Sequence, residues 1–434
     1  MNGRSLRIKT KAKTPLFFRR RIIVLLGILA LVSFSVYQFG GPSNSTIQIV
    51  ESGVKQPSEE EEYINDSIKE LDEELGVELQ ETVFDYERSN ATFFTLARND
   101  DLKGILSAIR SVEERFNHNY HYDWVFANDE TFTQEFIQLT SGAVSGNPTY
   151  VKIPKEFWSY PSWIDQDLAA DVRDQMEADN IKYGNSESYR HMCRFNSGFF
   201  YKLPAMQKYR YYWRVEPDIS FNCNIDYDLF KYMESNNKVY GFTMAPYEIH
   251  TTVLSLWSVV QNFTTSYPQY VSDDNNSELL TDDEGETFNM CHFWSNFEIG
   301  DMDFYRTEAY EDFFEYIDYS GGIYYERWGD APIHTMAAAF LLDKDQVHYV
   351  DNTGYYHSPN GQCPINAEIR EKLECDCSPE YDYNWSDDSC IPLYYEINNM
   401  EMPDEVSGFS GLKTHKYGKE NSNPIVKAGF DVIS

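Results

Sequence analysis

From residue 91 onward, short apolar segments alternate with stretches of helical periodicity. The apolar segments are typical of buried strands, and the stretches between them repeat apolar residues every three or four positions, as amphipathic helices do. This alternation predicts an α/β fold with a parallel sheet, helices on both faces, and ligands bound at the carboxyl ends of the strands. The first expected strands cover residues 91–97, 124–127 and 150–153, with helices over residues 102–116 and from Phe132.

The same patterns predict later elements. Strands are expected over residues 209–215 and 347–350, and helices over residues 226–234, 307–319 and 331–342. Residues 272–286 are acidic and lack periodicity, so we expect a surface loop there.

Neither G-x-G-x-x-G nor G-x-x-x-x-G-K-[ST] occurs in the chain, which excludes the dinucleotide fingerprint and the P-loop.

The N-terminus combines a basic segment with an apolar one. Residues 1–21 hold eight Lys and Arg and no acid, and residues 22–39 form an uncharged, largely apolar run of 18 residues. Such a run is about the shortest that spans a bilayer core of roughly 30 Å. Since Lys and Arg favour the cytoplasmic side, we predict a cytoplasmic tail (1–21) and a single transmembrane signal anchor (22–39) of type II topology. A cleaved signal peptide is the alternative, although its apolar core would be shorter.

The rest of the chain is strongly acidic. Its net charge is −34, and beyond residue 21 there are 28 basic against 70 acidic residues, so the folded part would repel nucleic acid. Residues 40–89 are Glu-rich and are predicted to be an extended luminal stem. Residues 90–397 are predicted to form one globular domain, and residues 398–434 a polar, disordered tail.

Cysteines and sequons fit a luminal domain. Seven cysteines predict disulfides in an oxidising compartment and leave at least one thiol unpaired. We expect the framework within the cluster Cys363, Cys375, Cys377 and Cys390, with its pairing open; a zinc site is the alternative for this cluster. Six Asn-X-Ser/Thr sequons are consistent with luminal exposure: Asn44, Asn65, Asn90, Asn262, Asn275 and Asn384.

An acid-Pro-acid turn follows the strand expected at residues 209–215. Pro217 cannot join a sheet ladder, so the strand should end there and leave Glu216 and Asp218 at its carboxyl end. One or two carboxylates at such a place can hold a divalent cation whose shell is completed by phosphate oxygens. Helix capping or exposure to solvent is the alternative for such a turn.

Several unusual strings surround this turn and resemble one family. They are YYWRVEPD (211–218), YRHMCRF (189–195), CHFWSNFE (291–298), GG (321–322), ERWGDAP (326–332) and GYYH (354–357). These strings follow one another along the chain in the same order as in the family, and over residues 91–395 they closely resemble the fungal Golgi α-1,2-mannosyltransferases. The resemblance implies a GT-A-type, Rossmann-like domain with a mixed central sheet that binds nucleotide sugar. It also implies GDP-mannose as donor, Mn²⁺ as metal, retention of the α configuration, a mannose-terminated O-linked or N-linked glycan as acceptor, and a Golgi membrane location.

The resemblance also implies a metal site. Glu216 resembles the family's metal-binding carboxylate and His357 its second protein ligand, and Mn²⁺ accepts both oxygen and imidazole. Asp218 is expected to support the sugar or the turn. The alternative for His357 is a surface histidine in a loop rich in Gly and Pro.

Three further residues gain catalytic roles from the resemblance. Glu298 follows an aromatic string that should shield it from water, and the family implies a nucleophile or a stabiliser of the oxocarbenium ion; a structural carboxylate paired with an arginine is the alternative. Tyr189 resembles a tyrosine near the donor, and packing is its alternative. Asp330 either caps a helix N-terminus or orients or deprotonates the acceptor hydroxyl.

Three arginines are candidates for binding the diphosphate. Arg98, Arg194 and Arg214 lie at predicted strand or motif ends, and guanidinium groups bind phosphate in a bidentate way.

Two other functions stay open. A mannosylphosphate transferase on the same fold would release GMP rather than GDP, and a non-catalytic Golgi glycan-binding scaffold would have lost Glu216, Glu298 and His357, all of which are present.

Overall fold

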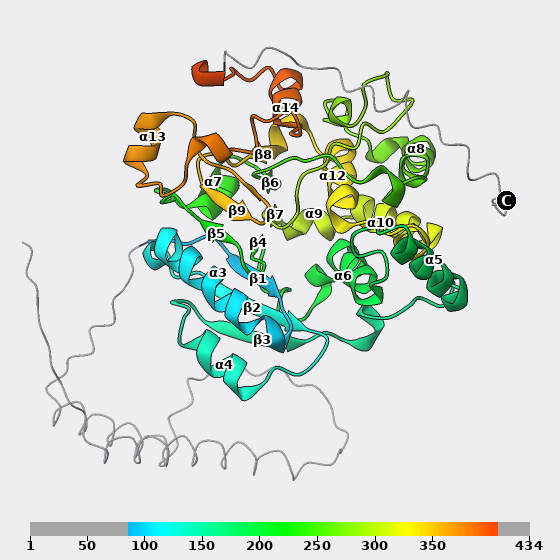
Figure 1. Ribbon diagram of the computed structural model, residues 1–434, viewed down its shortest axis with the longest axis horizontal. Helices are drawn as coiled ribbons and strands as arrows, with labels where there is room; N and C mark the ends of the chain where they lie inside the picture. The colour runs from blue at the N-terminus through cyan, green and yellow to red at the C-terminus, as the bar shows by residue number, and fades with distance from the viewer. Residues whose placement is uncertain (1–85, 407–434) are drawn as a thin grey trace, which may run out of the picture. The chain divides into compact units, whose positions relative to one another are not determined.

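A computed structural model of the protein describes residues 86–406. A seven-stranded sheet, in the order β3-β2-β1-β4-β7-β6-β8, lies at its centre, and a three-stranded sheet has the order β10-β9-β5 (Figure 1). The strands are β1 (Ala91–Leu96), β2 (Asp123–Asn128), β3 (Pro148–Lys152), β4 (Tyr211–Arg214), β5 (Ser220–Phe221), β6 (Tyr240–Phe242), β7 (Glu298–Asp301), β8 (Val347–Tyr349), β9 (Tyr355–His357) and β10 (Asn360–Gly361). The α-helices are α3 (Leu102–Arg115), α4 (Gln134–Ser141), α5 (Gln166–Ala178), α6 (Glu187–Gly198), α7 (Leu229–Ser235), α8 (Leu256–Ser266), α9 (Met302–Tyr305), α10 (Glu308–Ser320), α11 (Gly322–Tyr325), α12 (Asp330–Leu341), α13 (Ala367–Lys372) and α14 (Ile391–Ile397).

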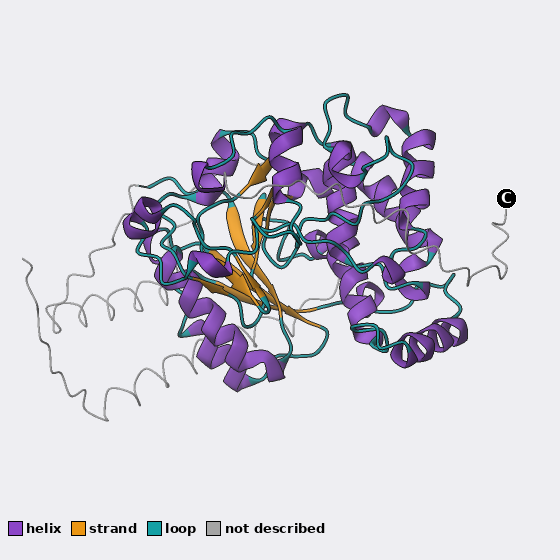
Figure 2. Cartoon of the chain, turned by 45° about the horizontal axis from the view of Figure 1, so that its top comes forward, coloured by secondary structure: helices purple, strands orange, loops and turns teal. Residues whose placement is uncertain are grey.

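Each face of the large sheet has its own hydrophobic core. Because successive strand residues point to opposite faces, Phe93 and Trp124 lie in one core with the apolar residues of α3 and α4. Phe94 and Tyr212 lie in the other core with residues of α6, α10 and α12. Helices therefore cover the strands on both sides, as Figure 2 shows, and the predicted α/β architecture is confirmed.

The sheet is mixed rather than wholly parallel. Strands β3, β2, β1 and β4 are parallel neighbours, but β7 runs antiparallel to both β4 and β6. The mixed sheet that the family resemblance implied is thus correct, and the all-parallel sheet expected from alternation is wrong. The sequence of β7, EIGD, contains a single strongly apolar residue, so no apolar run reveals this strand.

Most predicted elements match observed ones to within a few residues, and the loop predicted at residues 272–286 has exposed acidic residues but is anchored at its centre. Its centre forms a 3-10 turn, Ser277–Leu280, in which Leu279 and Leu280 are fully buried. The amide of Asn276 donates to the carbonyl of Ala339 in α12, at 2.9 Å. The segment therefore packs on α12, and its short turn is too brief to show periodicity.

Three disulfides cross-link the domain, and they correct the predicted framework. Within the expected cluster, Cys363 pairs with Cys377. Its other two members pair with distant cysteines, in the bonds Cys223–Cys375 and Cys291–Cys390. Cys193 is free and buried, so the prediction of an unpaired thiol is confirmed. Sequence separations of 152 and 99 residues explain why the cluster alone could not reveal these bonds.

The predicted tail and anchor, residues 1–39, lie outside the described residues, as does most of the predicted stem. The last stem residues are described and contact the domain: the Tyr86 hydroxyl donates to Asp228 at 2.9 Å, and Ser89 is buried. Across residues 86–406, no helix is long and apolar enough to cross a membrane. At the other end, the described chain stops at Val406, whose side chain lies in the core.

Candidate active site

A cavity of about 580 Å³ lies at the carboxyl ends of β1, β2 and β4. Residues that follow these strands line it, among them Arg98, Asp129 and Glu216. Loops after β6 and β9 and the N-termini of α6 and α12 contribute further wall residues. In open α/β sheets this edge is where ligands bind.

Glu216 and His357 meet at one wall of this cavity. The strand β4 ends before Pro217, and β9 pairs with β5 so that Tyr356 lies opposite Ser220. This pairing brings Nε2 of His357 to 3.5 Å from Oε2 of Glu216. The Nδ1 atom of His357 lies 3.2 Å from the carbonyl of Ser358, which can only accept, so Nδ1 carries a proton and donates. Nε2 then faces the carboxylate, to which it donates when it is protonated, and it can offer its lone pair to a cation when it is not.

The charge of Glu216 is fixed by its neighbours. Burial by itself would raise the pKa of this carboxyl, but Arg214 and His357 outweigh burial and lower the pKa to about 2. Arg214 donates a hydrogen bond to Oε1, which leaves Oε2 directed at His357. Glu216 is therefore ionised at neutral pH and offers one oxygen to the cavity.

The pair fits a divalent cation. Two ligand atoms that each lie about 2.1 Å from one cation are separated by roughly 3.0 to 3.5 Å, and the observed separation is 3.5 Å. Carboxylate oxygen with imidazole nitrogen is a donor set that Mn²⁺ accepts. Within residues 86–406 no group of three or more His, Cys, Asp or Glu could hold a metal, so a cation here needs oxygen from substrate or water to complete its shell.

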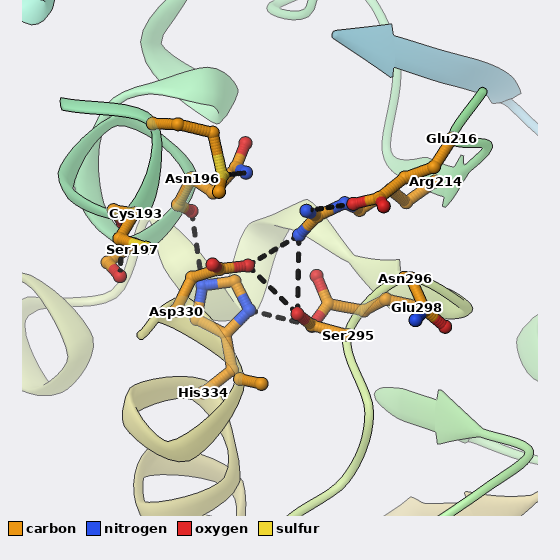
Figure 3. A network of polar contacts seen from close by, with 12 residues as sticks. Cys193, Asn196, Ser197, Arg214, Glu216, Ser295, Asn296, Glu298, Asp330 and His334 are labelled. Atoms are coloured by element: carbon orange, nitrogen blue, oxygen red, sulfur yellow. Dashed lines mark hydrogen bonds and ion pairs between the residues drawn. The ribbon is translucent and has the colours of Figure 1, made fainter. Parts of the chain in front are cut away.

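Arg214 links Glu216 to Asp330 (Figure 3). Its Nη1 donates to Oδ2 of Asp330 at 2.5 Å, and Ser295 donates to the same oxygen at 2.9 Å. Gly329 is the N-cap of α12 and Asp330 is its first residue, so Asp330 does not cap the helix and instead lies in the cavity wall. The contacts orient two carboxylates relative to each other across one buried guanidinium. Ser295 was not predicted, although it lies in one of the family strings.

Glu298 does not line the cavity. It is 1% exposed at the start of β7, directly opposite Arg214 on β4. Its carboxylate accepts hydrogen bonds from Tyr212, from Tyr240 at 2.7 Å and from Nδ1 of His334 at 2.7 Å. The predicted direct action on the substrate is therefore not supported by this geometry, because fixed donors already occupy both oxygens. Burial alone would lower the pKa of Arg214, but the charges of Glu216, Asp330 and Glu298 together raise it well above its usual value.

Arg194 and Asp218 are also placed away from the cavity. Arg194 forms a bidentate, buried pair with Asp318, with contacts of 2.8 and 2.7 Å. Asp218 adopts a left-handed backbone with φ of 63° and supports the turn against α3. A Cβ on Gly104 would lie 2.8 Å from the Asp218 carboxyl, so this close approach requires glycine. Neither residue lines the cavity, so this geometry does not support the prediction that they bind the donor.

Tyr189 and Arg98 do lie in the cavity wall. Arg98 is at the rim, where its guanidinium makes contacts of 3.1 and 3.0 Å with Asp101 and its side chain is 74% exposed. The ring of Tyr189 stacks on Tyr183 at 4.8 Å and contacts the guanidinium of Arg327 at 5.3 Å. Burial raises the pKa of Tyr189 well above its usual value, so its hydroxyl stays a donor.

Residues 46–399 match the family described as glycolipid 2-alpha-mannosyltransferase. The chain is 52% identical over 319 residues to glycolipid 2-alpha-mannosyltransferase 2 of Candida albicans, covering 74% of this chain and 69% of that protein. It is 41% identical over 392 residues to O-glycoside alpha-1,2-mannosyltransferase omh1 of Schizosaccharomyces pombe, covering 90% and 98%.

A solved structure agrees with the fold. The crystal structure of core-mannan synthase A from Aspergillus fumigatus, in its Mn/GDP form, superposes with a TM-score of 0.69 at 38% identity, covering 73% of this chain and 87% of that one. The sequence strings around the cavity, the family match and the fold agree. The chain belongs to the glycolipid 2-alpha-mannosyltransferase family.

Proposed function

We propose that this protein is a GDP-mannose-dependent α-1,2-mannosyltransferase that requires Mn²⁺ and retains the α configuration. Its acceptor is a mannose-terminated O-linked or N-linked glycan, and its domain is of the GT-A type. The observation that carries the proposal is the pair of Glu216 and His357, whose facing oxygen and nitrogen lie 3.5 Å apart at the carboxyl ends of the strands. Two facing acceptors of this kind need a proton or a cation between them.

Relatives support both the donor and the acceptor. The Aspergillus fumigatus structure contains Mn and GDP by its description. The Schizosaccharomyces pombe relative is named an O-glycoside alpha-1,2-mannosyltransferase. The Candida albicans relative is named a glycolipid 2-alpha-mannosyltransferase. These names agree on transfer of mannose in α-1,2 linkage.

The residues of the cavity divide the chemistry between them. Glu216 and His357 would hold Mn²⁺, which when bound neutralises the charge that develops on the departing diphosphate. Arg214 keeps both Glu216 and Asp330 in place through two charged hydrogen bonds. Asp330 borders the cavity with its carboxylate and orients the acceptor hydroxyl, a role that needs hydrogen-bond reach. Glu298 acts from behind Arg214 as a positioning residue.

The proposed location is the Golgi membrane, with residues 22–39 as a type II anchor and the domain in the lumen. The basic segment 1–21 and the apolar run after it support the anchor. Three disulfides in the domain support an oxidising compartment. Immunofluorescence with a Golgi marker, together with protease protection of the domain in sealed vesicles, tests this location.

Release of nucleotide from GDP-mannose tests the function. Purified full-length protein is incubated with α-methyl mannoside or mannobiose, with and without Mn²⁺, beside Glu216→Ala. Manganese-dependent release of GDP with an elongated α-linked product, lost in the variant, is the expected result. Release of GMP would instead identify a mannosylphosphate transferase, and no turnover with any acceptor would favour the glycan-binding scaffold.

A further inference from the structure

Within residues 86–406, a cavity of about 310 Å³ lies apart from the active site, and the two share no lining residue. Residues of α7, β8 and α13, which lie close together in Figure 1, form its wall with the segments 224–227 and 351–353. Small-ligand sites have volumes of about 300–1,000 Å³. This cavity is at the lower end of that range, so it suits a small ligand such as a single sugar unit.

Three aromatic rings follow one another along the wall of this cavity. The ring of Tyr232 lies 4.7 Å from that of His348, with 34° between the planes, and 5.7 Å from that of Tyr227, with 69° between them. Burial above all lowers the pKa of His348 to about 4, so the imidazole is uncharged at neutral pH. Tyr227 is 37% exposed, so a ligand can reach its ring. The three rings offer an uncharged surface for the apolar face of a small ligand.

Asp351 adds a carboxylate oxygen with free acceptor sites. Its Oδ1 accepts hydrogen bonds from the amide of Asn352 at 2.7 Å, from Gln362 at 3.0 Å and from the hydroxyl of Tyr349 at 3.3 Å. All three donors contact Oδ1, so within the described part of the chain Oδ2 keeps its acceptor sites for a ligand. Burial raises the pKa of this carboxyl, and a hydroxyl that donates to Oδ2 would compensate for the water that burial removes.

The charges around the cavity balance one another. Asp226 pairs with Lys372 at 2.7 Å, and the charge of Lys238 acts after burial as the second cause of the low pKa of His348. The carboxylate of Asp351 would repel a phosphate group, and the two lysines would weaken the binding of an organic cation. An uncharged ligand with hydroxyl donors meets neither obstacle. A sugar is such a ligand, because it combines hydroxyls with an apolar C–H face.

The cavity is fixed in place at the far end of β9 from the metal pair. The amide of Cys223 donates to the carbonyl of Thr353 at 3.3 Å, and the disulfide Cys223–Cys375 joins this segment to the chain that follows α13. A strand rises about 3.3 Å per residue, so Thr353 lies up to about 13 Å from His357. The cavity is therefore preformed and separate from the place where the metal would bind.

We propose that this cavity is a second sugar-binding site, which holds a neutral hexose unit of a glycan against Tyr227 while a sugar hydroxyl donates to Oδ2 of Asp351. The choice of mannose as the hexose rests on the proposed function, because both the acceptor and the elongated product carry mannose. The preference for a neutral sugar depends only on the cavity. The site holds a glycan on the enzyme without taking part in transfer.

Hydrogen exchange read by mass spectrometry locates the binding, with α-1,2-linked mannotriose as the probe. In full-length protein saturated with GDP and Mn²⁺, mannotriose at ten times its dissociation constant is expected to slow exchange in residues 224–232 and 348–353 by up to about tenfold. Tyr227→Ala and Asp351→Asn should each need about tenfold more mannotriose for the same effect. Tyr381→Ala is the matched control, since Tyr381 is 79% exposed and does not line the cavity, and it should behave as wild type.

The outcomes separate this proposal from the proposed function. If wild type transfers no mannose but mannotriose slows exchange in both segments, only the proposed function fails. If wild type transfers mannose and exchange in these segments is the same with and without mannotriose, the sugar site is overturned. An unchanged mannotriose requirement in both variants, at melting temperatures equal to wild type, would also overturn it. Slower exchange with tetramethylammonium chloride but not with mannotriose would identify a cation site instead.

Discussion

Two glutamate–histidine pairs flank Arg214, and they differ in what else can reach them. Glu216 and His357 are 26% and 28% exposed and 3.5 Å apart, with their facing atoms open to the cavity. Glu298 and His334 are each 1% exposed and 2.7 Å apart, and two tyrosine hydroxyls also donate to the carboxylate. The residue types are identical, and only the surroundings differ.

The difference shows what makes such a pair a metal site. A pair open to solvent, with lone pairs that no protein donor uses, can exchange its water for a cation and a substrate. A buried pair whose atoms are already bonded to protein groups on every side stabilises the fold and shapes the field around it. His334 illustrates the second case, because its Nε2 is also engaged, 3.1 Å from the carbonyl of Asn196.

Removing the open pair should have the largest effect on activity. Glu216→Ala and His357→Ala each take away one of two protein ligands, and we expect a loss of more than about 10²-fold in kcat/KM. Binding of Mn²⁺ in the presence of GDP, measured by calorimetry, should be lost as well. Asp218→Asn, in the same turn but directed at α3, serves as the control and should keep most activity. Loss of activity in this control with intact folding would restore the donor-binding role for Asp218.

Changing the buried pair should affect the fold first. Glu298→Gln keeps the shape of the side chain but removes its negative charge, which faces two tyrosines, His334 and Arg214. We expect the free energy of unfolding to fall by about 2–3 kcal/mol. Urea denaturation at pH 7 measures this. Two results together would contradict the comparison. Glu298→Gln would be as stable as wild type but inactive, and azide would restore turnover of GDP-mannose by Glu298→Ala, with mannosyl azide as the product. The carboxylate would then act on the sugar.

The open pair should also make stability depend on pH. The pKa of Glu216 is lowered from 4.5 to about 2, because Arg214 and His357 outweigh the effect of burial. The pKa of Glu216 is lower in the folded than in the unfolded state, so its carboxylate stabilises the fold fully above about pH 4.5. This contribution is lost as the pH falls from 4.5 towards 2. The shift corresponds to at most about 3 kcal/mol. Unfolding of wild type and Glu216→Gln, compared in chelator between pH 5 and 3, should therefore converge as the pH falls. A constant difference would contradict this sign.

The sequence predicts one half of the sheet better than the other. Strands β1 and β2 are apolar runs and were placed to within two residues, whereas β7 is short and polar and was missed. The family strings place Glu216, His357 and Asp330 in the wall of one cavity, but they do not reveal which residues of a string face that cavity.

Long-range partners account for the site residues that were misplaced. Arg194 pairs with Asp318, which lies 124 residues away, and Glu298 is enclosed by side chains from β4, β6 and α12. No local pattern encodes such partners. Glu248 and Arg327 also line the cavity; Glu248 lies in no family string, and Arg327 lies in one but had no predicted role.

The smallest effect extends the comparison to glycosylation, where identical sequons also differ in exposure. Asn90 and Asn262 are exposed, whereas Asn384 is fully buried and its Nδ2 donates to the carbonyl of Thr243 at 2.8 Å and to Tyr349 at 2.9 Å. A glycan on that nitrogen would replace a donor proton and has no room in the core. We therefore expect glycopeptide mass spectrometry of the protein, when it is expressed through the secretory pathway, to find occupancy at Asn90 or Asn262 and none at Asn384. Asn262→Gln should leave transfer within about twofold, since surface changes rarely alter stability by more than about 0.5 kcal/mol. Occupancy at Asn384 in folded, active protein would show that burial does not decide between identical motifs in this chain.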